Sequence, residues 1–244
     1  MNGPCRSARN PSCAASCRQA LAFQGGGGLL NIATLPTFGA RWLAPRIGGF
    51  RALHPRLALS LTVRAWPFDL VEENIDIAVY FGEKPWPGGP SDLLMEEEII
   101  PVCAPSLLAP HGPVSTVADL DRLALLHHRA RPRAWKDWLQ LAGASEVNPF
   151  HGVRFEQFEM IIQAAISGMG MAIVPRFMIE AELADGRLVA PFARAMKSAE
   201  SYYLVCPERK RDLPAVQAFR RWVLDEVSVF RQRQRDENRL APKG

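Results

Sequence analysis

The spacing of hydrophobic residues in the first third of the chain switches between a strand-like and a helix-like pattern. Residues 29–33 form a short apolar run, residues 57–63 alternate Leu or Val with small side chains, and residues 75–81 form a more continuous apolar run, so each segment predicts a strand. Apolar side chains recur at helical spacing from Trp42 to Leu53, and a short helix is expected at 67–73. This β-α-β-α-β order predicts a parallel sheet, whose ligands gather at the carboxyl ends of its strands.

A second α/β unit follows over residues 106–206. A strand at 98–105 leaves the first sheet, and a strand at 202–207 has similar text, with Val-Cys followed by Pro in both. If both strands cross between the units, the chain goes out once and returns once, which makes a hinge with a cleft between two lobes. The elements expected inside the second unit are helices at 117–123, 134–142, 155–167 and 177–184 and a buried strand at 171–175.

These patterns divide the chain into four parts. Residues 29–104 together with 207–230 form lobe I, and residues 105–206 form lobe II. Residues 1–28 are expected to be a disordered arm or a linker remnant, and residues 231–244 a basic disordered tail. The expected fold class is therefore α/β, with two Rossmann-like lobes joined by two crossover strands.

The net charge of +4 is concentrated at the two ends of the chain. Residues 1–28 carry +3 and residues 231–244 carry another +3, which leaves −2 for residues 29–230. A nucleic-acid-binding domain concentrates its cations on a folded face. The body of the chain is therefore a poor candidate for contacting phosphate backbones.

Several other classes of protein are not expected from these residues. No apolar run approaches the roughly 18 residues of a membrane-spanning helix, and the N-terminal residues lack the apolar core of an export signal. Neither a catalytic motif nor a zinc spacing of the five cysteines is present, and Glu96-Glu97-Glu98 is interpreted as an exposed acidic turn. We expect a cytoplasmic protein that is not an enzyme and holds no metal or cofactor.

Six segments, in order, resemble the regulatory domain of LysR-type transcriptional regulators, especially the glycine-cleavage-activator-like subgroup. They are LPTFGARWLAPRIGGFRALHPRLALSL, DIAVYFG, LLMEEEIIPVCAPSLL, DLDRLALLHHRARPRAWKDWLQLAGA, FEQFEMIIQAAISGMGMAIVP and YYLVCPERKRDLPAVQAFRRWVLDE. The resemblance covers about residues 29–230. It implies the fold of type 2 periplasmic solute-binding proteins, which agrees with the two lobes and two crossings expected from the pattern.

The N-terminal residues depart from this family. Its members begin with a winged helix-turn-helix and a long linker helix, and residues 1–28 are too few and too interrupted by Pro and Gly to supply them. CRQALAFQ resembles a remnant of the linker helix. The expectation is a truncated or separately encoded sensor that lacks the helix-turn-helix and does not contact DNA directly.

The candidate ligand site lies where the first strand gives way to a helix. A helix that starts there presents free N–H groups and partial positive charge, which favours a carboxylate or other anion. Thr37 can add a hydroxyl, and the resemblance implies effector contact at this position, while the structural alternative is that Thr37 caps its own helix. The predicted ligand-binding residues are Thr34, Pro36, Thr37, Phe38, Trp66, Phe68, Tyr80, Phe81, Gly82, His127, Phe155, Phe158 and Tyr203.

A basic cluster follows the strand that ends near His128. Arg131 and Arg133 are interpreted as members of a solvated loop, and one of the two histidines, His127 or His128, is a candidate to reach the cleft.

The function expected from all of this is an effector sensor for transcription control. A small metabolite, carboxylated or amino-acid-like, is expected between the lobes, and a homodimer through the helix at 42–53 is implied by the resemblance. The alternatives are a solute-binding receptor of the same fold, an enzyme of unknown type, and a truncated gene product.

Overall fold

The computed structural model describes residues 28–64, 68–83, 85–86, 88–111, 114, 116–192 and 194–240. The described strands form one sheet in the order β2-β1-β3-β8-β4-β7-β5-β6. The strands are β1 (Leu29–Thr34), β2 (Ala58–Val63), β3 (Ile77–Gly82), β4 (Ser91–Val102), β5 (Leu125–His128), β6 (Val153–Phe155), β7 (Met171–Pro175) and β8 (Met196–Val205).

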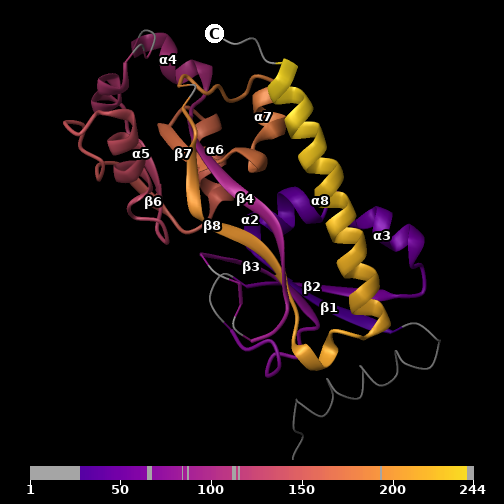
Figure 1. Cartoon of the computed structure of the whole chain (residues 1–244). Helices are drawn as coiled ribbons and strands as arrows, with labels where there is room; N and C mark the ends of the chain where they lie inside the picture. Colours follow the sequence, from indigo (N-terminus) through magenta and orange to yellow (C-terminus); the bar gives the residue numbers. More distant parts are fainter. Residues whose placement is uncertain are drawn as a thin grey trace, which may run out of the picture.

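Short helices connect these strands, and one long helix closes the described part of the chain (Figure 1). The α-helices are α2 (Pro36–Phe38), α3 (Ile47–Leu53), α4 (Pro105–His111), α5 (Ala134–Ala142), α6 (Phe158–Ile166), α7 (Glu180–Ala184) and α8 (Pro214–Leu240). The tighter or wider helical turns are the π-helix η2 (Gly39–Leu43) and the 3₁₀ turns η3 (Val117–Arg122), η4 (Arg176–Met178) and η5 (Glu208–Lys210). Within the described residues, no helix has both the length and the apolar composition to cross a membrane.

Strand direction divides the sheet into two lobes. Strand β1 pairs in parallel with β2 and β3 in the first lobe, and β5 pairs in parallel with β6 and β7 in the second. Between them, β4 and β8 pair antiparallel with each other, and Figure 1 shows both running through the middle of the molecule. This arrangement confirms the predicted two Rossmann-like lobes with two crossover strands, the type 2 periplasmic-binding-protein fold.

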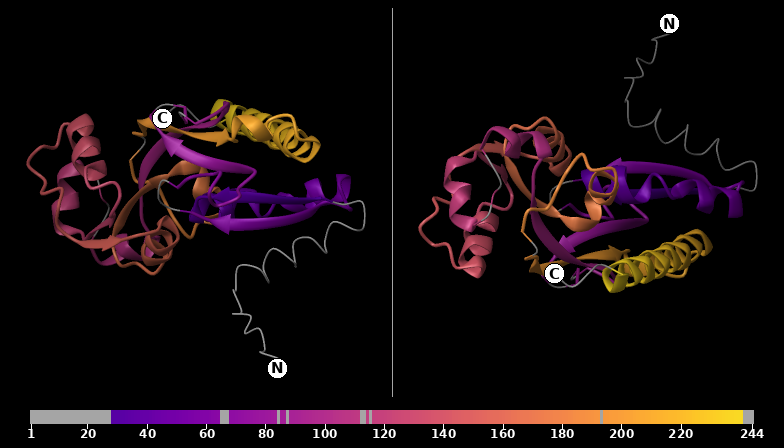
Figure 2. Two further views of the ribbon diagram at one scale, coloured as in Figure 1. Left: turned by 90° about the horizontal axis from the view of Figure 1, so that it is seen from below. Right: turned by 90° about the horizontal axis from the view of Figure 1, so that it is seen from above.

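The first lobe and α8 form two layers. Successive side chains of β1 point to opposite faces of the sheet. Leu30 and Ile32 therefore belong to the largest core cluster, while Ala33 belongs to a smaller cluster on the other face. Phe219 and Trp222 of α8 pack against Phe50 of α3 with ring centroids 5.2 and 5.3 Å apart. Both views of Figure 2 show α8 alongside the first lobe, with the second lobe at the opposite end. Helix α8 therefore packs on the first lobe.

The main core is continuous across the two lobes. The cluster that holds Phe38, Phe50 and Phe219 also includes Phe158 and Ile161 of α6 in the second lobe. A separate cluster around Trp135 and Trp138 lies within the second lobe. The lobes are therefore packed against each other, and the exact residues that divide them stay a prediction.

Two of the predicted helices differ from the structure. The helix expected from Trp42 to Leu53 is interrupted by a turn at residues 44–46, where Pro45 removes a backbone donor. The helix expected at 67–73 is wrong for the described residues: residues 70–74 form turns, and Asn74 adopts a φ of 52°, which the short polar side chain of Asn tolerates better than most.

The crossover strands are longer than predicted, and the last helix extends into the expected tail. Strand β4 begins at Ser91 and β8 at Met196, and the added segments carry charged residues such as Glu96 and Lys197 at exposed positions of the antiparallel pair. Helix α8 continues to Leu240, so a disordered tail from residue 231 is wrong for residues 231–240. Its first turns beyond residue 230 are held by side-chain contacts, with Gln234 Nε2 donating to Glu180 Oε1 at 2.8 Å. Residues 1–27 and 241–244 lie outside the described residues.

Candidate functional site

Arg131 lies at the meeting point of the two lobes. It follows β5 in the second lobe, and its guanidinium carbon is 4.7 Å from the ring centroid of Phe158 on α6. On its other side the same carbon is 4.3 Å from the ring centroid of Phe81 on β3, in the first lobe. A cation placed over aromatic faces at this distance is stabilised by the ring quadrupoles. The side chain therefore joins the lobes through one aromatic ring from each.

Both crossover strands contribute to the position of Arg131. Arg131 Nη1 donates to Oε2 of Glu97 on β4, and the Tyr202 hydroxyl on β8 donates to Oε1 of Glu97 at 2.8 Å. The Glu97 side chain is 0% exposed. Burial alone lowers the Arg131 pKa, but the Glu97 carboxylate and the Tyr202 hydroxyl outweigh it, and the pKa is raised. Arg131 is therefore a fixed cation at the centre of the molecule.

The environment of this group corrects two predictions. The interpretation of Glu96-Glu97-Glu98 as an exposed turn is wrong: all three belong to β4, and strand alternation exposes Glu96 and Glu98 while it buries Glu97. The interpretation of Arg131 as solvated is also wrong, since its side chain is 17% exposed. Arg133, at 74%, is exposed as predicted. The sequence signal that could have identified Glu97 is its place in the middle of a run with strand periodicity.

A second arginine joins the lobes through hydrogen bonds. Arg41 of η2, in the first lobe, donates from Nε and Nη2 to the two carboxylate oxygens of Glu159 on α6, at 2.5 and 2.9 Å. Its Nη1 donates to Glu182 Oε1 on α7 at 2.7 Å and to the Met178 carbonyl oxygen at 3.0 Å. Arg41 lowers the Glu159 pKa through these bonds. All three guanidinium nitrogens are thus used, and nothing in the sequence pattern around Arg41 predicted these contacts.

The predicted aromatic residues fall into two separate groups. In the first group, the ring centroids of Phe38 and Phe81 lie 5.4 and 4.7 Å from that of Tyr202. The rings of Phe81 and Phe158 both contact the Arg131 guanidinium. The other group faces the opposite side of the sheet.

In that second group, Tyr80 lies 6.4 Å from Tyr203 and 5.1 Å from Trp86, and Phe68 packs against the same cluster. Strand alternation explains the division, because Phe81 pairs with Tyr202 and Tyr80 with Tyr203 across β3 and β8. The structure therefore places Tyr202, rather than the predicted Tyr203, beside Arg131.

The predicted residues at the start of α2 are buried beside the first group. Thr34 and Thr37 are 3% and 4% exposed, and Pro36 is half-buried in the first turn. The N-cap position is Leu35, without a side-chain cap, so the structure gives no support to Thr37 as the cap. Gly39 is required here, since a Cβ at this position would lie 2.5 Å from Thr34 Cγ2.

The remaining predicted residues lie at the ends of β3, β5 and β6. Gly82 is buried beside the Tyr80 hydroxyl, and Phe155 is half-buried on β6 opposite His128. Trp66 lies outside the described residues.

The two histidines on β5 have different surroundings. The Nε2–H of His127 donates to the His151 carbonyl oxygen at 2.8 Å, inside the second lobe, and burial lowers the His127 pKa. The His128 ring lies 4.4 Å from Phe158, and burial, with the nearby charge of Arg131, lowers its pKa to about 4. His128 is therefore a neutral neighbour of the Arg131 group at pH 7.

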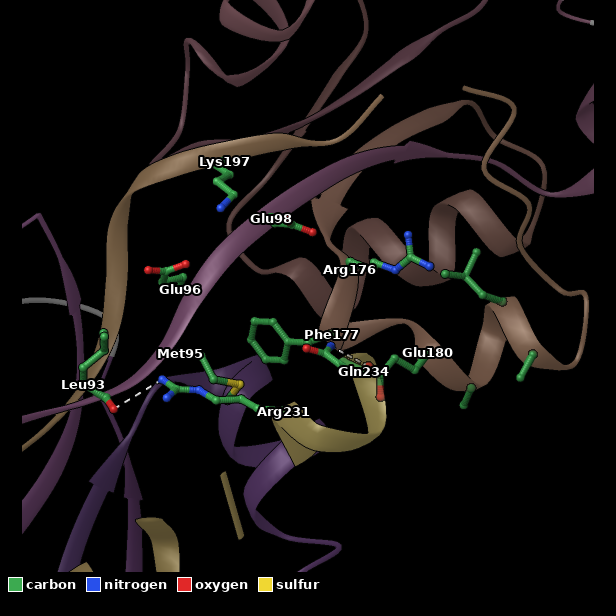
Figure 3. Close-up of a pocket in the computed structure, with 13 residues that line it drawn as sticks. Leu93, Met95, Glu96, Glu98, Arg176, Phe177, Glu180, Lys197, Arg231 and Gln234 are labelled. Atoms are coloured by element: carbon green, nitrogen blue, oxygen red, sulfur yellow. Dashed lines mark hydrogen bonds between the residues drawn. The ribbon is translucent and has the colours of Figure 1, made fainter. Parts of the chain in front are cut away.

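Two cavities flank the crossover strands. A small one of about 10 Å³ is lined by His127, His128, Arg131 and Phe158 with apolar neighbours, which is about the volume of one water-sized sphere. A larger one of about 970 Å³ lies between β4, β8, α7 and the end of α8. Figure 3 shows Arg176 and Lys197 on opposite sides of it, with Phe177 between them. None of the predicted ligand-binding residues lines the larger cavity.

Comparison with known proteins gives consistent results. The model of the family described as "LysR substrate binding domain" matches residues 23–228. The chain is 33% identical over 206 residues to the glycine cleavage system transcriptional activator of Escherichia coli (strain K12), which covers 84% of this chain and 67% of that protein. It is 32% identical over 211 residues to the HTH-type transcriptional activator AmpR of Pseudomonas aeruginosa, which covers 85% and 69%.

The solved structures agree with the family match. The effector domain of the transcriptional regulator AmpR of Pseudomonas aeruginosa is similar with a TM-score of 0.75 and 29% identity, over 84% of this chain and 98% of that one. The effector-binding domain of AmpR from Citrobacter freundii has a TM-score of 0.73 and 26% identity, over 82% and 98%. These relatives are transcriptional regulators. With the fold, the family match and these relatives in agreement, the chain belongs to the LysR substrate-binding-domain family, as the effector-binding domain of a LysR-type regulator.

Proposed function

We propose that this chain senses a small metabolite, carboxylated or amino-acid-like, that binds between its two lobes. The observation that carries the proposal is the convergence of both lobes and both crossover strands on one side chain. Arg131 contacts Phe81 of the first lobe and Phe158 of the second, and Glu97 of a crossover strand holds it. A ligand that enters here changes the contact between the lobes directly.

Binding at this place requires the lobes to separate. The cavity beside Arg131 has a volume of only about 10 Å³, while ligand pockets have volumes of about 300–1,000 Å³. A ligand that favours the separated form shifts the population toward it in proportion to its differential affinity. The sensor is thus proposed to act as an equilibrium between a packed and an open arrangement.

The class of ligand is supported by two observations. The carboxyl ends of parallel strands β1 and β5 meet the buried Thr34–Phe38 segment and the Arg131 cation, which favours an anionic group. A relative at 33% identity carries a name that refers to glycine cleavage, which makes an amino-acid-like metabolite the first class to test.

The change in lobe arrangement is proposed to be transmitted to a second copy of the chain through a homodimer contact on the first lobe. Leu53, at the end of α3, is 68% exposed, and Leu61 and Val63 on edge strand β2 are also exposed. Such a patch fits the dimer contact expected at residues 42–53, although Trp42, Leu43 and Phe50 themselves are core residues. Direct contact with DNA is not proposed for residues 29–230, because their net charge is −2.

The larger cavity is a second candidate location for the same function. Its volume of about 970 Å³ is large enough for a metabolite, and Arg176, Lys197, Glu96 and Glu98 supply charges of both signs. Apart from the buried Met95, its lining consists of exposed and half-buried side chains, which come mainly from the crossover strands, α7 and α8. A ligand there would shift the equilibrium between the lobe arrangements from the surface of the molecule.

A thermal-shift screen of amino acids and carboxylic acids tests the proposal. A ligand at 100 times its Kd stabilises the protein by about 2.7 kcal/mol, which raises the Tm by roughly 5–10 °C. We expect a hit whose effect is weakened by Phe81→Ala and is unchanged by Arg176→Ala. The reverse pattern would move the site to the larger cavity, and a complete metabolite library without a hit would contradict the sensing function.

A further inference from the structure

Arg131 keeps hydrogen-bond donors that the protein does not use. A guanidinium has five N–H groups. Within the described part of the chain, the hydrogen bond found for Arg131 runs from Nη1 to Glu97, and even a further bond to the neighbouring Tyr202 hydroxyl leaves several N–H groups over. Among described side chains, the buried polar atoms without a partner are Trp42 Nε1 and Glu182 Oε2. Neither atom belongs to Arg131, and the Arg131 side chain is 17% exposed, so solvent reaches part of it.

Two aromatic rings flank the Arg131 guanidinium, one from each lobe. Phe81 and Phe158 cover the guanidinium at 4.3 and 4.7 Å, so apolar groups occupy its flanks. The free N–H groups of an arginine form a planar fork whose geometry matches the two oxygens of a carboxylate. The partner that fits the uncovered part of the fork is therefore a carboxylate.

The contacts that hold Arg131 do not need to break when a ligand arrives. Glu97 is wholly buried and has its two oxygens bonded to Arg131 and Tyr202. Displacing it would leave a buried carboxylate without its cation, which costs far more than sharing the guanidinium. The separation of the Phe81 and Phe158 rings, by contrast, breaks a contact between lobes and exposes the fork.

We propose that Arg131 binds a carboxylate group of the effector through its free N–H groups, with Glu97 and Tyr202 as positioning residues. This inference rests on the proposed function and names the residue and the ligand group at that same site. The ligand carboxylate joins Glu97 on the guanidinium instead of replacing it, and the flanking rings accept apolar substituents of the ligand. Neither an amide nor an ester in place of the carboxylate supplies the charge that this fork requires.

The test uses three carboxylates and their carboxamides on the full chain. Glycine, succinate and benzoate are titrated at millimolar concentration by calorimetry, beside glycinamide, succinamide and benzamide. We expect at least one carboxylate to bind the wild-type protein and its carboxamide to bind at least about tenfold more weakly, the loss of one charge-assisted hydrogen bond.

Two substitutions in the same loop separate binding from folding. Arg131→Lys keeps a cation for Glu97 but lacks the planar fork, so we expect the Kd of that carboxylate to rise by about tenfold or more. Arg133→Lys is the matched control, because Arg133 is 74% exposed and pairs only with Asp137 of its own helix among the described residues. Its Kd should stay within twofold of the wild-type value. Circular dichroism on both variants checks that each is folded.

Each other outcome overturns the inference in a distinct way. Equal affinity for a carboxylate in Arg131→Lys and the wild-type protein removes Arg131 from the site, while the sensing function stands. Equal binding of a carboxamide removes the carboxylate requirement. No binding of any of the three carboxylates also overturns the inference, and another amino acid or carboxylic acid that binds in the thermal-shift screen independently of Arg131 would preserve the proposed function. A library without any hit contradicts both.

Discussion

Arg41 and Arg131 join the same two lobes, and their side chains are each 17% exposed. They differ in their hydrogen-bond partners and in the groups packed around the guanidinium. Arg41 uses Nε, Nη1 and Nη2 on two carboxylates and a carbonyl oxygen. Arg131 has one bonded carboxylate, and aromatic rings cover it in place of further acceptors. Burial therefore does not separate the two. The two arginines differ in how many guanidinium N–H groups have no acceptor among the described residues.

This difference indicates different roles for two similar ion pairs. A saturated arginine fixes the distance between the lobes and has nothing to offer a ligand. Arg131 has N–H groups without an acceptor among the described residues, and one carboxylate and two rings from different lobes hold it. It is therefore able to bind a ligand. We therefore treat Arg41 as a structural clamp and Arg131 as the responsive contact.

The largest effect is expected from Glu97→Ala. It removes the wholly buried carboxylate that accepts from Arg131 and Tyr202 and leaves the Arg131 cation unpaired, so the free energy of unfolding should fall by about 3–5 kcal/mol. The Tm should fall by roughly 10 °C, measured by calorimetry. The double variant Glu97→Gln with Arg131→Met, which removes both charges, should recover most of the loss. A fall of less than 1 kcal/mol in the single variant would show that the pair is not buried as described.

Arg41→Met should lower stability less and leave ligand affinity alone. The substitution leaves Glu182, whose side chain is 5% exposed, without its Arg41 hydrogen bond, and frees the half-exposed Glu159. We expect the free energy of unfolding to fall by about 2–3 kcal/mol in urea titrations. The Kd of the carboxylate identified above should stay within about threefold. A loss of affinity as large as that of Arg131→Lys would remove the distinction between clamp and responsive contact.

His128, a neighbour of Arg131, is a titratable group. The His128 pKa is about 4 in the folded protein, against 6.5 as its ordinary value, so the unfolded chain binds the proton more readily between these values. Stability is then complete above pH 6.5 and is lost as the pH falls toward 4. After allowance for the partial exposure of this ring, the loss is on the order of 2 kcal/mol.

His128→Gln isolates this contribution, because glutamine does not titrate. Urea titrations of the wild-type protein at pH 7 and pH 4.5 should differ by more than those of the variant, by about the amount just given. Parallel curves for the two proteins would show that His128 is not held neutral by its surroundings.

The smallest effect is expected from Thr37→Val. The side chain is 4% exposed, and the substitution removes one hydroxyl at nearly constant volume. If the hydroxyl contacts the ligand, affinity falls by about threefold to tenfold while the Tm changes little. Titration of the identified ligand checks it, and unchanged affinity would remove the start of α2 from the site.

The fold was predictable from the sequence because strand and helix periods are carried by apolar residues. The parallel β1–β3 unit, the second α/β unit and the two crossover strands all follow from runs such as 75–81 and 171–175. The site was predictable only as a region. Strand alternation turned Tyr203 away and Tyr202 inward, and the same alternation buried Glu97 within an acidic run.

The arginines were not predictable because their partners are distant in the sequence. Arg41 reaches Glu159 and Glu182 across more than 100 residues, and Arg131 reaches Glu97 across 34. The residues next to a charged side chain in a polar segment do not indicate that it pairs with a buried carboxylate elsewhere in the chain. Such pairs become visible only once both crossover strands bring the lobes together.

A crystal structure of the wild-type protein with a carboxylate from the titration series tests the central claim most directly. The account predicts the ligand carboxylate against the free N–H groups of Arg131, with Glu97 still bonded to the guanidinium and the Phe81 and Phe158 rings moved apart. A ligand bound in the cavity lined by Arg176 and Lys197, with Arg131 still enclosed between the two rings, would contradict it.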